Sequence, residues 1–434
     1  MRLLSIILIS FFINLVLAQS SDDKPSQTLA QPSEEELRRQ SFEKVWDTIN
    51  KKHYDKTFGG GDWGKIREIY EPKALKAQNR AEFHKILNQM LEELKVSHVG
   101  VYDLKPADFE LRAKTGIIGI EIKIIENKPV IWRVEKNSTA DRAGLKPGFI
   151  IEKINDLSTR SVLERVESYF SSIRATDRIR LLYKEKVITT LIEGEPKTKL
   201  SLEVINSKNE LQKVEVERYQ ANWQMSEPIG YFPPQPIIFE AYKIGDDIGY
   251  IRFNVWTIPQ ISRIRAAIQS LANAKGIIFD IRGNPGGISG MAAGIAGMLF
   301  KEPVSLGKMR GRELDLNLLV NPQPNPYLGK VIILMDYGTA STSEIFAIGL
   351  QENSRAVLIG ETTAGMALPS IFETLPTGAL FQYAIMDYIS PKGTLVEGRG
   401  VKPDLEVSQR RQDLLEGRDL PLEIAIQNII RNKN

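Results

Sequence analysis

Three short apolar runs in the second half of the chain constrain the fold most strongly. They span residues 276–281, 331–335 and 356–360. Runs of this length without polar alternation are typical of strands in a parallel sheet that is covered on both faces. Residues 249–253 read as a further strand, and residues 259–274 have a helical pattern that precedes the first run. Strands and helices therefore alternate here, and the sequence predicts an α/β core.

The second apolar run leads into Asp336-Tyr-Gly-Thr-Ala-Ser341-Thr-Ser-Glu344, which predicts a tight turn followed by a helix. Ser341 would lie at the N-terminus of that helix, where backbone N–H groups and the helix dipole stabilise negative charge. A serine nucleophile and a developing oxyanion both need such surroundings. The same stretch also fits a capping box, in which Ser341 and Glu344 only satisfy backbone donors. This segment alone leaves both interpretations open.

A second glycine-rich turn, Arg282-Gly-Asn-Pro-Gly-Gly287, follows the first apolar run. It would lie at the carboxyl end of its strand, where open α/β sheets bind their ligands. Glycine there lets a substrate carbonyl come close to main-chain N–H groups, as an oxyanion hole requires. Phosphate binding is the rival interpretation, although the spacing is neither a Walker nor a dinucleotide motif.

The N-terminal sequence and the composition suggest an exported protein. Residues 1–18 have the pattern of a signal peptide, with an uncleaved membrane anchor as the alternative, and residues 19–34 have that of a flexible leader. The chain of 434 residues has no cysteine, which, for an exported protein, fits a bacterial periplasm better than an animal extracellular space, with secretion as the alternative. A net charge of +3 indicates no nucleic-acid partner, and we expect no stable membrane insertion after signal cleavage.

Helical spacing dominates residues 35–112, and short strands follow in residues 113–218. Within the second region, Gly116-Ile-Ile-Gly-Ile120 precedes a strand, and residues 143–148 precede another at 150–155. This arrangement resembles a PDZ domain, which binds a peptide C-terminus as an added strand. The resemblance implies that the tail carboxylate is held by backbone N–H groups of Gly116, Ile117, Ile118, Gly119 and Ile120. A spacer or lid is the alternative. Residues 163–204 run longer than the usual module, so the shape of the groove is open.

Together with this region, the motifs at residues 279–287 and 339–345 resemble the C-terminal processing (tail-specific) serine proteases over nearly the whole mature chain. The resemblance implies that residues 219–434 form a crotonase-like catalytic core with Ser341 as the nucleophile. It further implies that the oxyanion donors come from Gly286 or Gly287 and from Thr342. No metal or cofactor is implied.

The commoner branch of this family activates its serine with a lysine, and the matching position here is Met366. A thioether is no useful proton acceptor at neutral pH. The pair Ser97-His98 is instead similar to the tricorn-type branch, whose site is a tetrad of Ser, His, Ser and Glu. That likeness implies His98 as general base, Ser97 as its orienting hydroxyl and Glu397 as the carboxylate. Neighbouring side chains of a strand point to opposite faces, so the backbone at Ser97 and His98 must leave strand geometry.

Several other polar residues are interpreted as structural, namely His53, His84, Asp280, Arg282, Glu352 and Asp404. Lys392 is the next candidate base if His98 does not serve. The sequence therefore predicts a serine endopeptidase whose substrates are proteins or peptides with free C-termini. Because the usual lysine is missing, a catalytically inactive ligand- or peptide-binding relative is the alternative. Whether chains associate into a homo-oligomer is left open.

Overall fold

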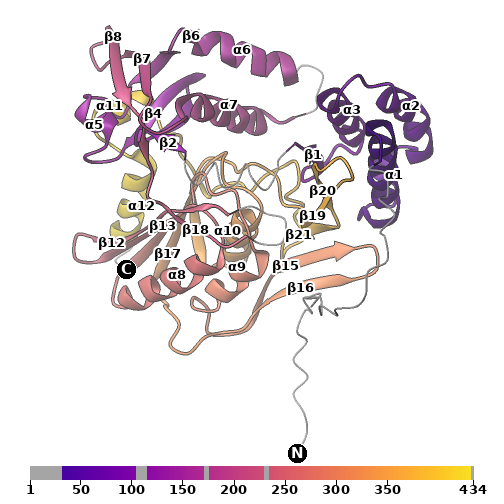
Figure 1. Cartoon of the computed structure of the whole chain (residues 1–434). Coiled ribbons are helices and arrows are strands. Elements are labelled where there is room, and N and C mark those ends of the chain that lie inside the picture. Colours follow the sequence, from indigo (N-terminus) through magenta and orange to yellow (C-terminus); the bar gives the residue numbers. More distant parts are fainter. Residues whose placement is uncertain (1–31, 104–114, 171–174, 229–233, 432–434) are drawn as a thin grey trace, which may run out of the picture.

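The computed structural model describes residues 32–103, 115–170, 175–228 and 234–431. Figure 1 shows three parts, which we call the helical region (residues 32–103), the middle region (115–228) and the α/β core (234–431). The predicted signal peptide and nearly all of the predicted leader lie outside the described residues. Among the residues that are described, no helix combines the length and the apolar character needed to cross a bilayer.

The helical region consists of α1 (Glu34–Lys52), α2 (Trp63–Leu75) and α3 (Arg80–Glu92), with the short 3-10 helix η1 (Phe58–Gly60) between the first two. The first and third helices confirm the predicted helical spacing. α2 was not predicted, because the glycines before it indicate a break and Pro72 lies within it. Asp62 caps α2 by accepting hydrogen bonds from the N–H groups of the first turn, which allows the helix to start directly after the glycines.

The middle region is built on one sheet in the order β3-β4-β5-β7-β8. Its strands and helices, in chain order, are β2 (Gly116–Ile117), β3 (Ile120–Ile125), β4 (Lys128–Val134), α5 (Thr139–Arg142), β5 (Ile150–Ile154), β6 (Leu157–Ser158), α6 (Thr159–Phe170), α7 (Asp177–Ile192), β7 (Lys199–Ile205), β8 (Leu211–Glu217), β9 (Tyr219–Gln220) and β10 (Gln224–Met225). Residues 163–204, by which this region is longer than the PDZ domains that its sequence resembles, contain most of α6 and all of α7.

The α/β core confirms the predicted alternation. A six-stranded sheet runs in the order β12-β13-β14-β17-β18-β22, parallel from β13 onward, with β12 antiparallel at one edge. Its elements are β11 (Pro236–Ile237), β12 (Phe239–Ile244), β13 (Ile248–Phe253), α8 (Ile258–Ser270), β14 (Gly276–Asp280), α9 (Ser289–Ala296), β17 (Lys330–Met335), α10 (Thr342–Glu352), β18 (Ala356–Gly360), β22 (Leu405–Glu406), α11 (Arg411–Leu415) and α12 (Leu420–Arg431).

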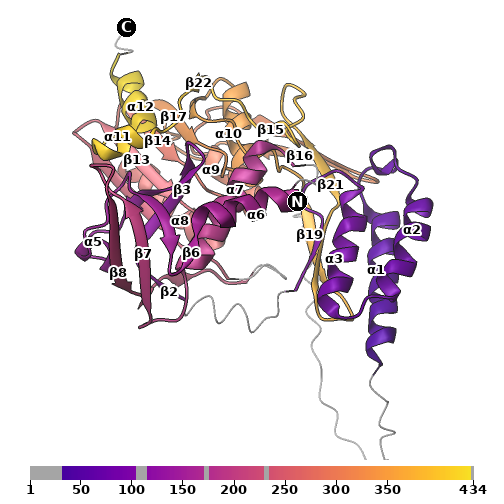
Figure 2. The ribbon, with the colours of Figure 1, turned by 90° about the horizontal axis from the view of Figure 1, so that it is seen from above.

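Both faces of this sheet are buried, as the unbroken apolar runs predict. Ile277 and Phe279 of β14 pack in one cluster with residues of α8, α9 and α10. Ile278, which points the other way, packs with Ala425 and Ile429 of α12. The sheet therefore forms the middle layer between two layers of helices, an arrangement that can be followed in Figure 2.

Two small sheets attach to the core and were not predicted. One contains β15 (Val304–Gly311), β16 (Asp315–Val320) and β21 (Met386–Ile389). The other joins β1 (Gly100–Tyr102) to β20 (Leu380–Ala384) and β19 (Ser370–Thr374). Gly100 pairs with Gln382, so this second sheet fixes the end of the helical region to the core.

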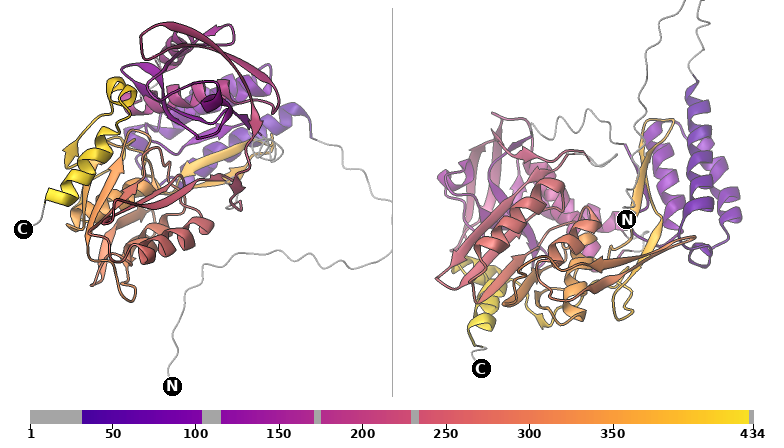
Figure 3. Two further views of the ribbon diagram at one scale, coloured as in Figure 1. Left: turned by 90° about the vertical axis from the view of Figure 1, so that its left-hand side faces the viewer. Right: turned by 90° about the horizontal axis from the view of Figure 1, so that it is seen from below.

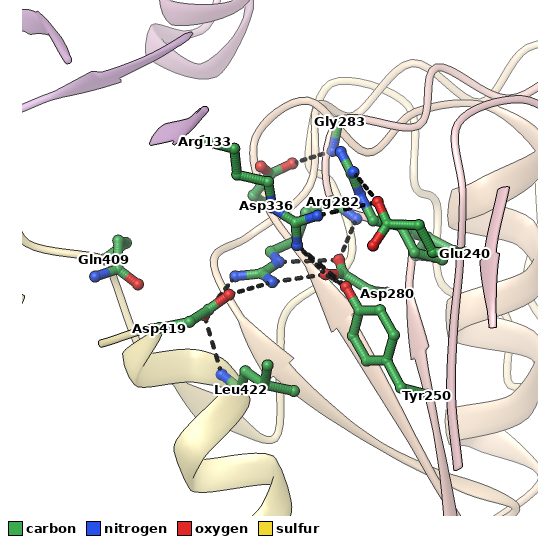
Figure 4. Close-up of polar contacts among 12 residues, drawn as sticks. Arg133, Glu240, Tyr250, Asp280, Arg282, Gly283, Asp336, Gln409, Asp419 and Leu422 are labelled. Atoms are coloured by element: carbon green, nitrogen blue, oxygen red, sulfur yellow. Dashed lines mark hydrogen bonds and ion pairs between the residues drawn. The ribbon is translucent and has the colours of Figure 1, made fainter. Parts of the chain in front are cut away.

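The middle region and the core share a buried polar interface (Figure 4). Arg282 at the end of β14 forms ion pairs with Asp280 at 2.6 Å and with Asp419, next to α12, at 2.7 Å. Arg252 of β13 reaches across to Glu121 of β3 at 2.6 Å. Asp280 and Arg282 thus have the structural role that the sequence predicts. Figure 3 shows the same two parts lying against each other from two further sides.

Candidate active site

Ser341 lies where the sequence predicts, in the turn between β17 and α10. It is the N-cap of α10, with φ 55° and ψ −122°. A positive φ is strained for a residue other than glycine, and such strain concentrates at functional sites. Its backbone N–H donates to the carbonyl oxygen of Met366 at 2.9 Å and to Glu344 Oε2 at 3.0 Å. The tight turn is therefore held from two sides.

Glu344 holds this turn together with the segment that follows β18. Its buried carboxylate accepts four hydrogen bonds, from Ser341 N, Thr363 Oγ1 (2.5 Å), Gly365 N (2.7 Å) and Met366 N (2.9 Å). Burial raises the pKa of Glu344 to about 7, while these donors act in the opposite direction. From the sequence, Glu344 is expected only to cap the helix. No sequence pattern indicates its hydrogen bonds with Thr363, Gly365 and Met366.

The second glycine-rich turn lies directly against Ser341. Gly286 has φ 100°, and a Cβ placed on it would lie 2.7 Å from Ser341 Cβ and 2.9 Å from Thr342 N. Glycine is required here by the close approach and by the positive φ. The Gly286 N–H donates to Asn284 Oδ1 at 3.0 Å. Within the described residues, neither the Gly287 N–H nor the Thr342 N–H donates to a protein acceptor. These two donors are therefore available to a ligand oxygen.

Ser97, His98 and Glu397 come together although 300 residues separate the serine from the carboxylate. Ser97 Oγ lies 2.7 Å from His98 Nδ1 and 3.0 Å from Glu397 Oε2, and the Ser97 N–H donates to Glu397 Oε1 at 2.7 Å. His98 has φ 57°, so the backbone leaves strand geometry at the predicted place. The three side chains that the tricorn-type likeness implies thus form one hydrogen-bonded chain.

The protonation of this chain follows from its hydrogen bonds. If the Ser97 hydroxyl donates to Glu397, it accepts from His98 Nδ1–H, which leaves Nε2 as the unprotonated nitrogen of the neutral ring. Desolvation lowers the pKa of His98 to about 4, so the ring is neutral at neutral pH. Burial raises the pKa of Glu397, while the N–H groups of Ser97 and Ala367 lower it. A neutral imidazole with a free Nε2 is suited to accept a proton.

The segment 363–367 connects the two halves of the site. Glu344 binds the N–H groups of Gly365 and Met366, and the Ala367 N–H donates to Glu397 Oε2 at 3.1 Å. Within the described residues no hydrogen bond joins the side chains of Ser341 and His98 directly. Met366, which occupies the position of the usual lysine, thus lies beside Ser341 and contributes backbone contacts.

The other candidate bases lie elsewhere. Lys392 is exposed, and its N–H donates to Glu352 at the C-terminal end of α10. Ser341 caps the opposite end of that 11-residue helix, which is about 16 Å long. His53 and His84 are buried in the helical region, where His84 Nε2 lies 3.2 Å from Thr377 Oγ1. In the part of the chain that the structure describes, no three His, Asp or Glu side chains are grouped to hold a metal.

The residues expected to bind a peptide lie at the start of the sheet of the middle region. Gly116 and Ile117 form β2, which pairs with β9. Ile118 is buried, Gly119 has φ 83°, and Ile120 begins β3. β3 is the edge strand of its sheet, as an added peptide strand would require.

Comparison with known proteins finds a match to a family model in each of the two outer parts of the chain. A model of peptidase family S41 matches residues 247–407, and a model of the Tricorn protease C1 domain matches residues 34–92. A carboxyl-terminal-processing protease from Synechocystis is 27% identical over an alignment of 391 residues, which covers 88% of this chain and 82% of that protein.

Solved structures show the same fold. The photosystem II D1 C-terminal processing protease superimposes with a TM-score of 0.56 at 19% identity, covering 87% of this chain and 94% of that one. Mature CPAF superimposes with a TM-score of 0.62 at 14% identity, covering 92% of this chain and 99% of that one. At these identities the likeness concerns the fold and not the chemistry.

Proposed function

We propose that this chain, a serine peptidase of family S41, hydrolyses peptide bonds within protein substrates with Ser341 as the nucleophile and His98 as the general base. The observation that carries the proposal is the hydrogen-bonded chain from Glu397 through Ser97 to His98, which the segment 363–367 connects to a strained serine at a helix N-terminus. The match to the Tricorn protease C1 domain, which ends six residues before His98, supports the tricorn-type set of residues.

In the proposed reaction the same groups act first in forming the acyl-enzyme and then in its hydrolysis. His98 Nε2 takes the proton of Ser341 as its Oγ attacks the substrate carbonyl. The N–H groups of Gly287 and Thr342 stabilise the oxyanion that develops. His98 then returns the proton to the leaving amine, which leaves an acyl-enzyme on Ser341, and water releases the product by the same steps in reverse. Ser97 and Glu397 keep the imidazole in the required tautomer.

Covalent labelling distinguishes this enzyme from an inactive binding relative. A fluorophosphonate should attach once per chain at Ser341, and Ser341→Ala should abolish the labelling. His98→Ala should slow it severely, because the serine loses its base. Lys392→Ala is the matched control, and we expect its labelling rate to equal that of the parent. Failure of the parent to label, together with stoichiometric ligand binding, would make the chain a binding protein. The readout is intact-protein mass spectrometry.

Gly286→Ala should lower kcat on an unfolded protein substrate by about a hundredfold or more. The added Cβ would collide with Ser341 Cβ, Ala340 O and Thr342 N, at a φ that alanine rarely adopts. Gly290→Ala is the matched control, because a Cβ there meets nothing within 4 Å. It should retain the activity of the parent. Parental kcat in a folded Gly286→Ala protein would contradict the proposed position of the oxyanion donors.

The proposal also concerns the segment that binds the substrate. The relatives named above are described as carboxyl-terminal processing enzymes, and the loop from Gly116 to Ile120 is the segment expected to bind a tail. Two modes of substrate binding are therefore to be distinguished. Capture of a free C-terminus at this loop requires that amidation of a substrate C-terminus weaken cleavage, whereas recognition of an internal segment does not.

We also propose that the protein is exported. The signal-like residues 1–18 support it, and the absence of cysteine favours the periplasm over an animal extracellular space as the destination. N-terminal sequencing of the protein recovered from the periplasm should show cleavage after Ala18.

A further inference from the structure

We propose that the peptide-binding edge of β3 is filled by this chain's own Tyr337 and helix α7, and that the middle region braces the nucleophile turn instead of capturing substrate tails. The inference rests on the proposed peptidase function and decides between its modes of substrate binding. Substrates would then be selected by internal sequence in an unfolded segment, with no requirement for a free carboxyl end.

Tyr337 occupies a position on β3 that an added peptide strand would need. β3 is the edge of its sheet, and the Ile124 N–H donates to the Tyr337 hydroxyl at 2.9 Å. In an added peptide strand, a carbonyl oxygen would accept a hydrogen bond from such an N–H group. The Tyr337 hydroxyl in turn donates to Glu185 of α7 at 2.7 Å. The aromatic side chain thus spans from β3 to α7, and it comes from the turn that carries Ser341.

A buried lysine ties the same edge to both catalytic turns. Lys123 of β3 pairs with Asp336 at 2.9 Å and with Glu185 at 3.5 Å. Asp336 Oδ1 accepts from the N–H groups of Gly283 at 2.8 Å and Gly338 at 2.9 Å, as Figure 4 shows for the first of these. Gly283 belongs to the glycine-rich turn at residues 282–287, and Gly338 belongs to the turn that carries Ser341. β3 and α7 therefore support both turns through charged contacts.

α7 is part of the hydrophobic core of the middle region. Ile188 and Ile192 are 0% and 4% exposed and belong to the same cluster as Ile122 and Ile124 of β3. At its other end, Arg178 donates to the carbonyl oxygens of residues 398 and 399, directly after Glu397. α7 thus contacts the loops of the nucleophile and of the catalytic carboxylate at once.

These contacts make exchange of α7 for a substrate tail unfavourable. A tail bound along β3 would have to displace Tyr337 and α7, which would take Glu185 away from the buried Lys123 and from the Tyr337 hydroxyl. Removal of one partner from a buried ion pair is strongly destabilising. The displaced isoleucines would also be exposed to water. The neighbouring pair of Glu121 with Arg252 covers the strand from the side of the core.

Matched peptides test the inference on the whole protein. Internally quenched peptides of one sequence are made with a free C-terminal carboxylate and with a C-terminal amide. We expect kcat/KM values that agree within about twofold. We also expect Ser341→Ala to show no saturable binding, by calorimetry, that depends on the free carboxylate. A loss of more than about tenfold on amidation, or carboxylate-dependent binding to Ser341→Ala, would overturn the inference. If the parent cleaves no peptide, the proposed function fails, while the binding measurement still decides the occupancy of β3.

Tyr337→Phe tests the bracing role. Tyr337 lies four residues before Ser341, so loss of its hydroxyl should lower kcat about tenfold and leave KM unchanged. Glu185→Gln should show the same pattern. Tyr327→Phe is the matched control, since this buried hydroxyl donates to the Ala274 carbonyl oxygen at 2.9 Å. It should lower the melting temperature and keep kcat. A Tyr337→Phe protein that behaves like this control would overturn the bracing role.

Discussion

Ser341→Ala and His98→Ala should each lower kcat by about 10⁴-fold or more, and the double variant should lose no more than either single variant. The two groups act in one step, because the hydroxyl is a poor nucleophile until a base removes its proton. The measurement is cleavage of an unfolded protein by the purified mature chain. Circular dichroism and the melting temperature of each variant show whether the fold is retained.

The variant Glu397→Gln measures how much the carboxylate contributes to kcat in comparison with His98. Glu397 contacts the Ser97 hydroxyl and N–H, so its charge reaches His98 only through Ser97. We expect a loss smaller than that of the His98 variant, with kcat affected and KM little changed. Parental cleavage by His98→Ala would mean that the base lies elsewhere. Additive losses in the double variant would mean that Ser341 and His98 do not act together.

The sequence predicts the nucleophile turn well because its signals are local. An apolar strand, a glycine-bearing turn and an apolar helix follow one another within residues 331–351, and each has its own pattern. The strands of the central sheet are predictable for the same reason. The choice between capping and catalysis at Ser341 cannot be made locally, because Glu344 does bind the Ser341 N–H as a cap and also holds the distant segment 363–367.

The position of His98 cannot be derived from local pattern. The resemblance to the tricorn-type branch implies its role, but only the pairing of β1 with β20 brings it beside the core. Such a contact between segments about 280 residues apart leaves no periodic signal in either strand. The same holds for Tyr337, whose neighbours in sequence suggest a turn and whose partners, Ile124 and Glu185, lie in another region.

In the middle region, the resemblance to a PDZ domain does not determine what the edge of β3 binds. The sequence predicts short strands and a glycine-rich loop before one of them, and the structure has both. The extra length at residues 163–204 leaves the groove undefined, and the structure places α7 from this stretch against β3. This contact supports our proposal that β3 has a structural role, so the resemblance alone does not identify a ligand.

The pH dependence of kcat/KM should place the ionisation of the base near pH 4. For the free enzyme this parameter reports the protonation of essential groups. Desolvation lowers the pKa of His98 to about 4, so the imidazole stays neutral, and able to accept a proton, down to that pH. At pH 5.5 a histidine of ordinary pKa would retain roughly a tenth of its basic form, whereas His98 should retain nearly all of it. Initial rates of peptide cleavage between pH 3.5 and 8 measure this.

Glu344 is the necessary control for this profile, since burial raises its pKa to about 7. Glu344→Gln should keep the limb near pH 4, because His98 and its partners are unchanged. A limb near pH 7 that disappears in this variant would assign the ionisation to Glu344. A limb near pH 6.5 that persists would show that His98 is hydrated and titrates as in water. The effect of pH on folding stability differs from its effect on kcat/KM. Between pH 6.5 and 4, His98 binds a proton in the unfolded chain but not in the folded protein. His98 therefore makes the folded state less stable as the pH falls through this window.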